Sequence, residues 1–156
     1  MTVKGRQNSN TAAINVSLTI AIPSGIEVTN NQDLNFGSML ATSAHNVVVG
    51  HDGTRNGNAS YLINDSANPY QAGVFTISNQ SSSAKTVQIS LPSSTSITNG
   101  SRSMTISNFT SNQSLDSNIN IPSGASITVN VGATLAVTAG VPAGEYTGTY
   151  TVTIDY

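Results

Sequence analysis

The sequence predicts an all-β protein with an immunoglobulin-like β-sandwich, and three observations lead to this fold class. Apolar residues recur at every second position in several stretches, which is the period of a strand with one buried face. No stretch has helical period, and Thr, Val and Ile dominate over the residues that favour helices. The alternating runs are short and are separated by Gly, Pro, Asn and Ser at the spacing typical of sandwiches and barrels. These patterns leave the strand order open.

Length and composition limit the kinds of function that this protein can have. The 156 residues fit one domain with a sizeable core. Only 8% are charged, against about 25% in an average soluble protein. The few basic residues are scattered and the net charge is −2, which gives little basis for binding nucleic acid. The chain has no cysteine, so we expect packing or assembly, and not disulfides, to stabilise it.

We expect an extracellular protein without a membrane span. No run of eighteen apolar residues is present, so no transmembrane segment is predicted. The first ten residues have no continuous apolar stretch, so we interpret the sequence as a mature form from which any signal peptide has been removed. A surface rich in Ser, Thr and Asn suits the outside of a cell.

The first predicted strand, over residues 12–22, is the longest uninterrupted alternation near the start. Its apolar positions are Ile14, Val16, Leu18, Ile20 and Ile22. Most strands are about half this length, and no charged residue or proline protects its edge. Burying the five side chains contributes on the order of 10 kcal/mol, comparable to the net stability of a whole domain. The strand therefore needs a groove, in its own domain or in a neighbouring molecule.

The next part of the chain contains short strands and the main loop region. We predict strands over 26–29 and 46–50, with Leu34 and Phe36 on one face between them. Residues 51–71 hold most of the turn signals, including Asp52-Gly53 and Asn56-Gly57, and one short strand at 61–63.

Alternation returns after residue 72. Strands are predicted over 74–78 and 86–91, followed by a hairpin of 94–98 and 102–108 around Asn99-Gly100. We predict loops over 109–117 and a strand over 126–138 with a bend or bulge at Gly132. The last strand, 145–156, places one set of residues on a single face: Tyr146, Tyr150, Val152, Ile154 and Tyr156.

Catalytic, metal and cofactor sites are not expected. His45 and His51 are the only histidines, and we interpret both as solvated loop residues without a third metal ligand. No nucleophile elbow or plausible triad accompanies the many serines, so we expect no enzyme and no cofactor. Tyr61 and Tyr70 are candidates for stacking on a sugar, and the alternative is that they hold the loops against the core.

Four stretches together resemble a known family. They are LNFG at 34–37, SLPSSTSITNGSRSMTISNF at 90–109, VGATLAV at 131–137 and AGEYTGTYTVTIDY at 143–156. Over about residues 26–156 the chain resembles a bacterial family of secreted β-sandwich domains, catalogued as domain-of-unknown-function family 4402. This family is similar in layout to the pilins of the archaic chaperone–usher systems, although the disulfide that those pilins usually carry is missing here.

The resemblance implies a pilin-like subunit of a cell-surface filament. It implies that Ile14, Val16, Leu18, Ile20 and Ile22 are donor residues that fill the groove of an identical neighbour. The strand 145–156 is then one wall of the acceptor groove and the edge bound by a chaperone. The implied partners are identical subunits in a homopolymer, a periplasmic chaperone and an outer-membrane usher.

The residues alone leave alternative interpretations open. In the donation hypothesis, 1–22 is an arm with the donor strand and 23–156 is the sandwich domain. In the first alternative, Pro23-Ser24-Gly25 is a hairpin loop and 12–22 folds back on its own domain. Others are a monomeric adhesin or carbohydrate-binding module that uses the 50–71 loops, and an exported matrix protein without a defined polymer.

Overall fold

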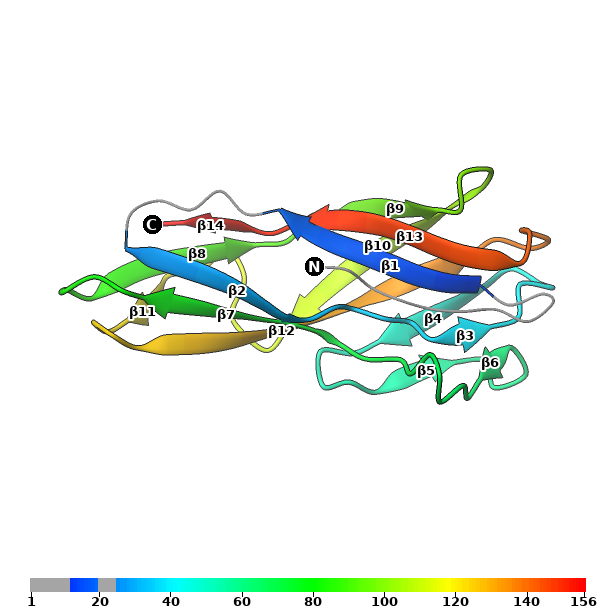
Figure 1. Cartoon of the computed structure of the whole chain (residues 1–156), viewed down its shortest axis with the longest axis horizontal. Helices are drawn as coiled ribbons and strands as arrows, with labels where there is room; N and C mark the ends of the chain where they lie inside the picture. Colours follow the sequence, from blue (N-terminus) through cyan, green and yellow to red (C-terminus); the bar gives the residue numbers. More distant parts are fainter. Residues whose placement is uncertain (1–11, 20–24) are drawn as a thin grey trace.

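The protein is built from strands, as the sequence predicts. The computed structural model describes residues 12–19 and 25–156, and for 12–19 it describes the backbone alone (Figure 1). Every regular element of this part is a strand in curled, mainly antiparallel sheets, which confirms the all-β class and agrees with a β-sandwich. No helix able to cross a membrane occurs among the described residues.

The strands have the following bounds in chain order: β1 Ala12–Thr19, β2 Ile26–Gln32, β3 Ser38–Met39, β4 His45–Val49, β5 Arg55–Gly57, β6 Leu62–Ile63, β7 Gly73–Asn79, β8 Lys85–Ser90, β9 Ser94–Thr98, β10 Ser103–Ser111, β11 Ile119–Ile121, β12 Ser126–Val137, β13 Gly144–Thr151 and β14 Thr153–Asp155.

The long strand β12 is the centre of the fold. Along one edge it pairs first with β7, up to Val131, and then with β4, from Ala133 onwards. Along the other edge it pairs with β10. The main sheet continues from β10 through β9 and β13 to β1, and from β7 to β2. Its inward side chains form the middle of the core: Val129, Val131, Ala133, Leu135 and Val137.

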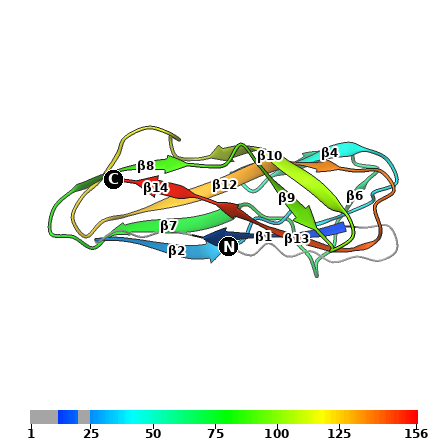
Figure 2. The ribbon, with the colours of Figure 1, turned by 90° about the horizontal axis from the view of Figure 1, so that it is seen from above.

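A second, smaller sheet closes one half of the molecule. It has the order β11-β8-β14, and its buried side chains include Val87, Ile89 and Ile154. Figure 2 shows β8 and β14 on one side of the molecule, with β7 and β2 on the other. At this end Asn79, which is buried, donates to the carbonyls of Ser83 (2.8 Å) and Ile121 (2.9 Å) and thereby joins the β7–β8 and β11–β12 turns.

Several predicted elements differ from the structure. The segment 109–117 is not all loop, because β10 continues to Ser111 through a bulge at Asn108 (φ 51°). The Phe109 ring packs on Tyr150, with ring centroids 5.3 Å apart, and this contact holds the polar segment in the sheet. The predicted last strand is interrupted at Val152, where its pairing changes from β9 to β8. Asn56-Gly57 lies within β5 and closes no turn.

Two of the turn predictions are confirmed. Asn99-Gly100 joins β9 to β10 as an antiparallel hairpin, with Gly100 at φ 91°. Asp52-Gly53 lies in the turn between β4 and β5, where the amide of Gly50 donates to the carbonyl of Thr54 at 2.9 Å.

Gly132 marks the point on β12 where β7 ends and β4 begins. A Cβ at this position would lie 2.4 Å from both the carbonyl oxygen of Val49 and the amide nitrogen of His51. Both are backbone atoms, one at the end of β4 and one in the connection that follows it, so they cannot move aside as a flexible side chain can. The predicted bend or bulge at this glycine is thus a site of close backbone approach.

We expect Gly132→Ala to lower the free energy of unfolding by about 2–3 kcal/mol, because the added methyl group displaces backbone in a packed sheet. Urea denaturation measures the loss. Gly124→Ala is the control: Gly124 has positive φ (70°), but no atom lies within 4 Å of the place that a Cβ would take, so only backbone strain of about 1 kcal/mol is expected. Equal losses in the two variants would contradict the proposed role of Gly132.

Candidate functional site

The pairing of β1 with β13 joins the start of the described chain to its last long strand. The two strands run parallel, and the register aligns Ala12 with Gly144 and Thr19 with Thr151. β1 thus accompanies β13 along its whole length, whereas β9 pairs on the other edge only at Thr147 and Gly148. Most of the sheet pairing of β13 therefore comes from the N-terminal segment.

The predicted acceptor strand turns most of its apolar side chains into the core. Tyr146, Tyr150, Val152 and Ile154 are buried, as the alternation indicates. Tyr156 follows in phase but lies beyond the end of β14 and is 44% exposed, so it is not part of this buried face. The hydroxyl of Tyr146 donates to the carbonyl of Pro142 at 2.9 Å, which fixes the turn that leads into β13.

The predicted donor residues are only partly within the described chain. The register of β1 places Ile14 opposite Tyr146, Val16 opposite Gly148 and Leu18 opposite Tyr150. Ile20 and Ile22 lie outside the described residues, and the described strand ends at Thr19. The backbone pairing thus aligns the predicted donor positions with the predicted acceptor strand.

β1 lies between β13 and β3. It pairs with β13, and it contacts β3 without pairing (Figure 1). β3 contains the buried Met39 and pairs on its other side with β6. β1 therefore bridges two strands that belong to different sheets.

The first alternative is wrong about the hairpin, although β1 does pair within its own chain, as that alternative expects. β2, which follows Gly25, pairs with β7, whereas β1 pairs with β13 of the same chain. This partner could not be read from the residues, because alternation indicates which positions face inward but not which strand lies alongside. A crossover between parallel strands needs a long connection, and here almost the whole domain separates β1 from β13.

Gly148 lets β9 approach β13 closely. A Cβ here would lie 2.5 Å from the carbonyl oxygen of Ser96. The hydroxyl of Thr95 also donates to the carbonyl of Thr149 at 2.6 Å. The short contact between β13 and β9 is therefore tight, and the opposite edge of β13 is the one that β1 occupies.

The two tyrosines of the predicted ligand loops lie in separate surroundings. The ring of Tyr61 stacks on His45, with centroids 4.6 Å apart. Tyr70 is 40% exposed and lies under the guanidinium of Arg55, 4.4 Å from the ring centroid. A hollow of about 200 Å³ includes Arg55 and Tyr70 in its lining but not Tyr61. The structure does not bring the two rings together at one binding surface.

Arg55 holds the loop region together and is a residue that sequence reasoning did not identify. Its guanidinium donates to the carbonyls of Phe36 (3.2 Å), Ser38 (3.2 Å) and Ile63 (3.0 Å). The side chain thus joins the 36–38 segment and β6 to β5. Its donors point to backbone carbonyls, which indicates a structural role.

The LNFG stretch at 34–37 also holds the loop region in place, from the side of the core. Leu34 and Phe36 are both buried, which agrees with the predicted shared face, and Asn35 between them is buried too. The side-chain amide of Asn35 donates to Asn68 at 2.8 Å, and its side-chain oxygen accepts from the backbone amide of Gly37, which has φ 74°. The motif therefore attaches the 64–71 loop to the core and contributes no exposed chemistry.

The two histidines have different surroundings. The prediction for His45 is wrong: it begins β4, is partly buried, and its Nε2 has no hydrogen-bond partner among the described residues. His51 lies in the β4–β5 turn, as predicted. Within the described ranges, no three His, Asp or Glu residues are grouped so as to hold a metal ion.

Burial of the β13 tyrosines makes stability dependent on alkaline pH. Burial raises the pKa of Tyr146 and, more strongly, that of Tyr150. Because the folded pKa is raised, the contribution to stability is complete below the unfolded value of about 10 and is lost as the pH rises above it. Each tyrosine that ionises only on unfolding lowers the free energy of unfolding by about 1.4 kcal/mol per pH unit.

We expect Tyr150→Phe to reduce this alkaline slope, measured by urea denaturation at several pH values between about 9 and 11. Tyr70→Phe is the matched control, because Tyr70 is exposed and keeps its ring on Arg55. An unchanged slope in Tyr150→Phe would show that ionisation of this hydroxyl is not linked to unfolding.

Comparison with known proteins assigns the family. A search of curated proteins gives no match. The family described as "Domain of unknown function (DUF4402)" matches residues 26–156, from the start of β2 to the end of the chain. The match includes the LNFG motif, the central strand β12 and the whole of β13 and β14. The chain therefore belongs to the DUF4402 family.

Proposed function

We propose that the chain is a structural subunit of an extracellular bacterial filament, and that it polymerises by donating its N-terminal strand to β13 of an identical neighbour. The observation that carries the proposal is the edge of β13. This edge is completed along its whole length by a segment that connects to β2 only through residues 20–25. A strand attached in this way can fill the same position in a second copy with the same backbone pairing.

The proposal has a physical basis in β-augmentation. An added strand gains main-chain hydrogen bonds, and the alternate side chains gain pockets, so the joint can be long-lived. The sequence of residues 12–22 has no charged residue or proline that would disfavour pairing. The partners that follow from the pilin resemblance are a periplasmic chaperone and an outer-membrane usher, with the assembled subunits at the cell surface.

A monomeric adhesin remains the second candidate. The described pairing of β1 with its own chain is the arrangement expected for a monomer. The exposed ring of Tyr70 beside a hollow of about 200 Å³ is the feature that favours a ligand-binding role. The two candidates differ in whether β1 ever leaves its own chain, and cysteine crosslinking tests this directly.

Ser17 and Thr149 are register partners, and the chain has no native cysteine. Neighbouring strands lie about 4.8 Å apart, within the range that a disulfide spans. We expect the double variant Ser17→Cys/Thr149→Cys, oxidised at high protein concentration, to give a ladder of covalent multimers on a non-reducing gel. We also expect Ser17→Cys and Thr149→Cys chains, refolded together, to give a crosslinked dimer of the two.

The control pairs Ser17→Cys with Thr153→Cys, which lies four residues beyond the register partner. This offset is about 13 Å along the strand, too far for a disulfide. Donation is contradicted if the first double variant gives only an internally crosslinked monomer and the mixed single variants give no dimer.

A charge in the donor strand provides a second test. Leu18 is in phase with Ile14 and Val16, so we expect Leu18→Asp to place an unpaired carboxylate in the groove at a cost of several kcal/mol and to abolish assembly. Ser17→Asp introduces the same charge at the alternate position and is expected to assemble. Negative-stain microscopy and size-exclusion chromatography measure the outcome, and filaments of normal length from Leu18→Asp would refute the assignment.

A further inference from the structure

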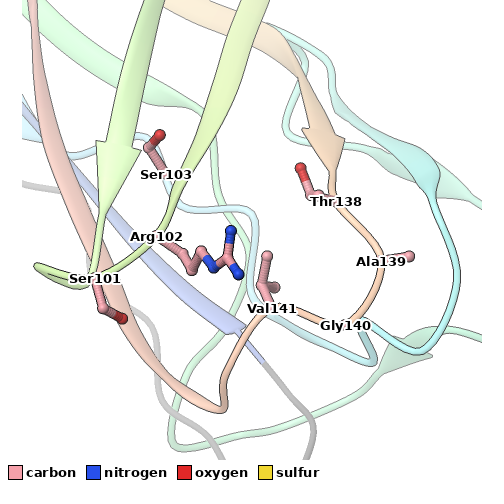
Figure 3. A pocket seen from close by; sticks show the side chains of 7 residues that line it. All are labelled: Ser101, Arg102, Ser103, Thr138, Ala139, Gly140 and Val141. Atoms are coloured by element: carbon pink, nitrogen blue, oxygen red, sulfur yellow. The ribbon is translucent and has the colours of Figure 1, made fainter.

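A polar hollow lies at the end of the molecule that carries the β9–β10 and β12–β13 connections. Its volume is about 320 Å³, and its lining includes Arg102, Ser103, Thr138 and Val141. Figure 3 shows the Arg102 side chain extending from the hairpin into the space beside the β12–β13 loop, with Val141 facing its guanidinium. Among the described residues, no Asp or Glu belongs to the lining. In the described part of the chain, the hollow therefore presents the cation of Arg102 without an anion beside it.

The hairpin wall of this hollow is held rigidly. The side-chain oxygen of Asn99 accepts from the backbone amides of Ser101 (3.0 Å) and Arg102 (2.9 Å). The hydroxyl of Thr98 donates to the carbonyl of Arg102 at 2.9 Å. The backbone amide and the backbone carbonyl of Arg102 are thus both held by hydrogen bonds, so the Arg102 side chain extends from a fixed backbone.

The opposite wall is fixed by two further contacts. The amide of Gly140 donates to the carbonyl of Ala41 at 2.8 Å, and the hydroxyl of Tyr146 holds the carbonyl of Pro142. Val141 is buried and forms an apolar surface between them. Because both walls are held in place, a ligand does not have to order the loops on binding, which reduces the entropic cost of association.

The polar groups of the hollow are available for a ligand. Within the described part of the chain, the Arg102 guanidinium pairs with no carboxylate, and the hydroxyls of Ser103 and Thr138 make no hydrogen bond. A guanidinium presents a planar set of donors that matches a carboxylate in two parallel hydrogen bonds. Hydroxyls both donate and accept, which suits the hydroxyls of a sugar.

We propose that this hollow binds one acidic sugar residue, a hexuronate, with its carboxylate on Arg102. The ring hydroxyls then lie toward Ser103 and Thr138, and a C–H face of the ring lies on Val141. The volume is at the lower end of the range for small-molecule sites and fits a single monosaccharide. The site is separate from the β1–β13 pairing and does not depend on strand donation.

The test is a titration of the ¹⁵N-labelled full-length protein with sodium glucuronate, followed by amide chemical shifts. We expect saturable shifts confined to the β9–β10 and β12–β13 connections, and at least tenfold weaker binding of glucose, which lacks the carboxylate. Acetate, which has the carboxylate without the sugar, is also expected to bind at least tenfold more weakly.

Matched variants test whether the charge of Arg102 binds the carboxylate of glucuronate. Arg102→Gln is expected to weaken glucuronate binding more than tenfold, and Arg102→Lys to weaken it less, since lysine keeps the charge but loses the planar donors. Lys85→Gln removes an equal charge from the start of β8, at the other end of the molecule, and is expected to bind normally (Figure 1). Because Arg102 is exposed, its variants are expected to fold, and their amide spectra check this.

Three results overturn the proposal. One is the absence of saturable shifts with glucuronate at these connections. The second is unchanged affinity in a folded Arg102→Gln variant. The third is acetate or glucose binding as tightly as glucuronate, because the hollow would then recognise an anion or a sugar alone.

Discussion

Completing the free edge of β13 is the main constraint on this fold. The strand supplies Tyr146 and Tyr150, two of the largest buried side chains, yet β9 pairs with it only at Thr147 and Gly148. The remaining backbone groups on its other edge need a partner, because unpaired polar groups next to a core are costly. β1 provides that partner from Gly144 to Thr151. The N-terminal segment is therefore part of what makes β13 a stable strand.

With few charges and no cysteine, the molecule fixes its turns with short polar side chains. Asn79 connects two turns at one end, Asn35 attaches the 64–71 loop, and Asn99 closes the hairpin at the other end. Each side chain supplies both donor and acceptor atoms close to the backbone, so it can make more than one hydrogen bond to neighbouring segments. The abundance of Asn and Ser in the sequence thus has a structural explanation that needs no ligand. Arg102 is different, because its guanidinium contributes to no such contact among the described residues.

The sequence predicted the parts of the fold that local pattern controls. The inward faces of 126–138 and 145–156 follow from alternation, and the hairpin follows from Asn99-Gly100. The continuation of β10 past Asn108 could not be predicted, since it depends on Phe109 meeting Tyr150 from a distant strand. The close approach at Gly132 likewise could not be predicted, because it arises where β4 takes over from β7 as the partner of β12. The interruption at Val152 arises where β8 takes over from β9 as the partner of the last strands. Of the candidate interface, the sequence identified both strands but not their parallel pairing within one chain.

Own-chain pairing and donation compete under simple physical rules. The two forms share the same backbone ladder, so their difference in free energy comes from the connection through residues 20–25 and from concentration. A short tether gives the own-chain strand an effective concentration in the millimolar range, above that of a secreted subunit. At the lower concentration of a secreted subunit, donation therefore requires that β1 be kept off its own β13 until a neighbour arrives, whereas the high protein concentration of the crosslinking experiment favours donation directly. A partner that occupies the β13 edge during export meets this requirement, which gives a chaperone a physical role in the proposed assembly.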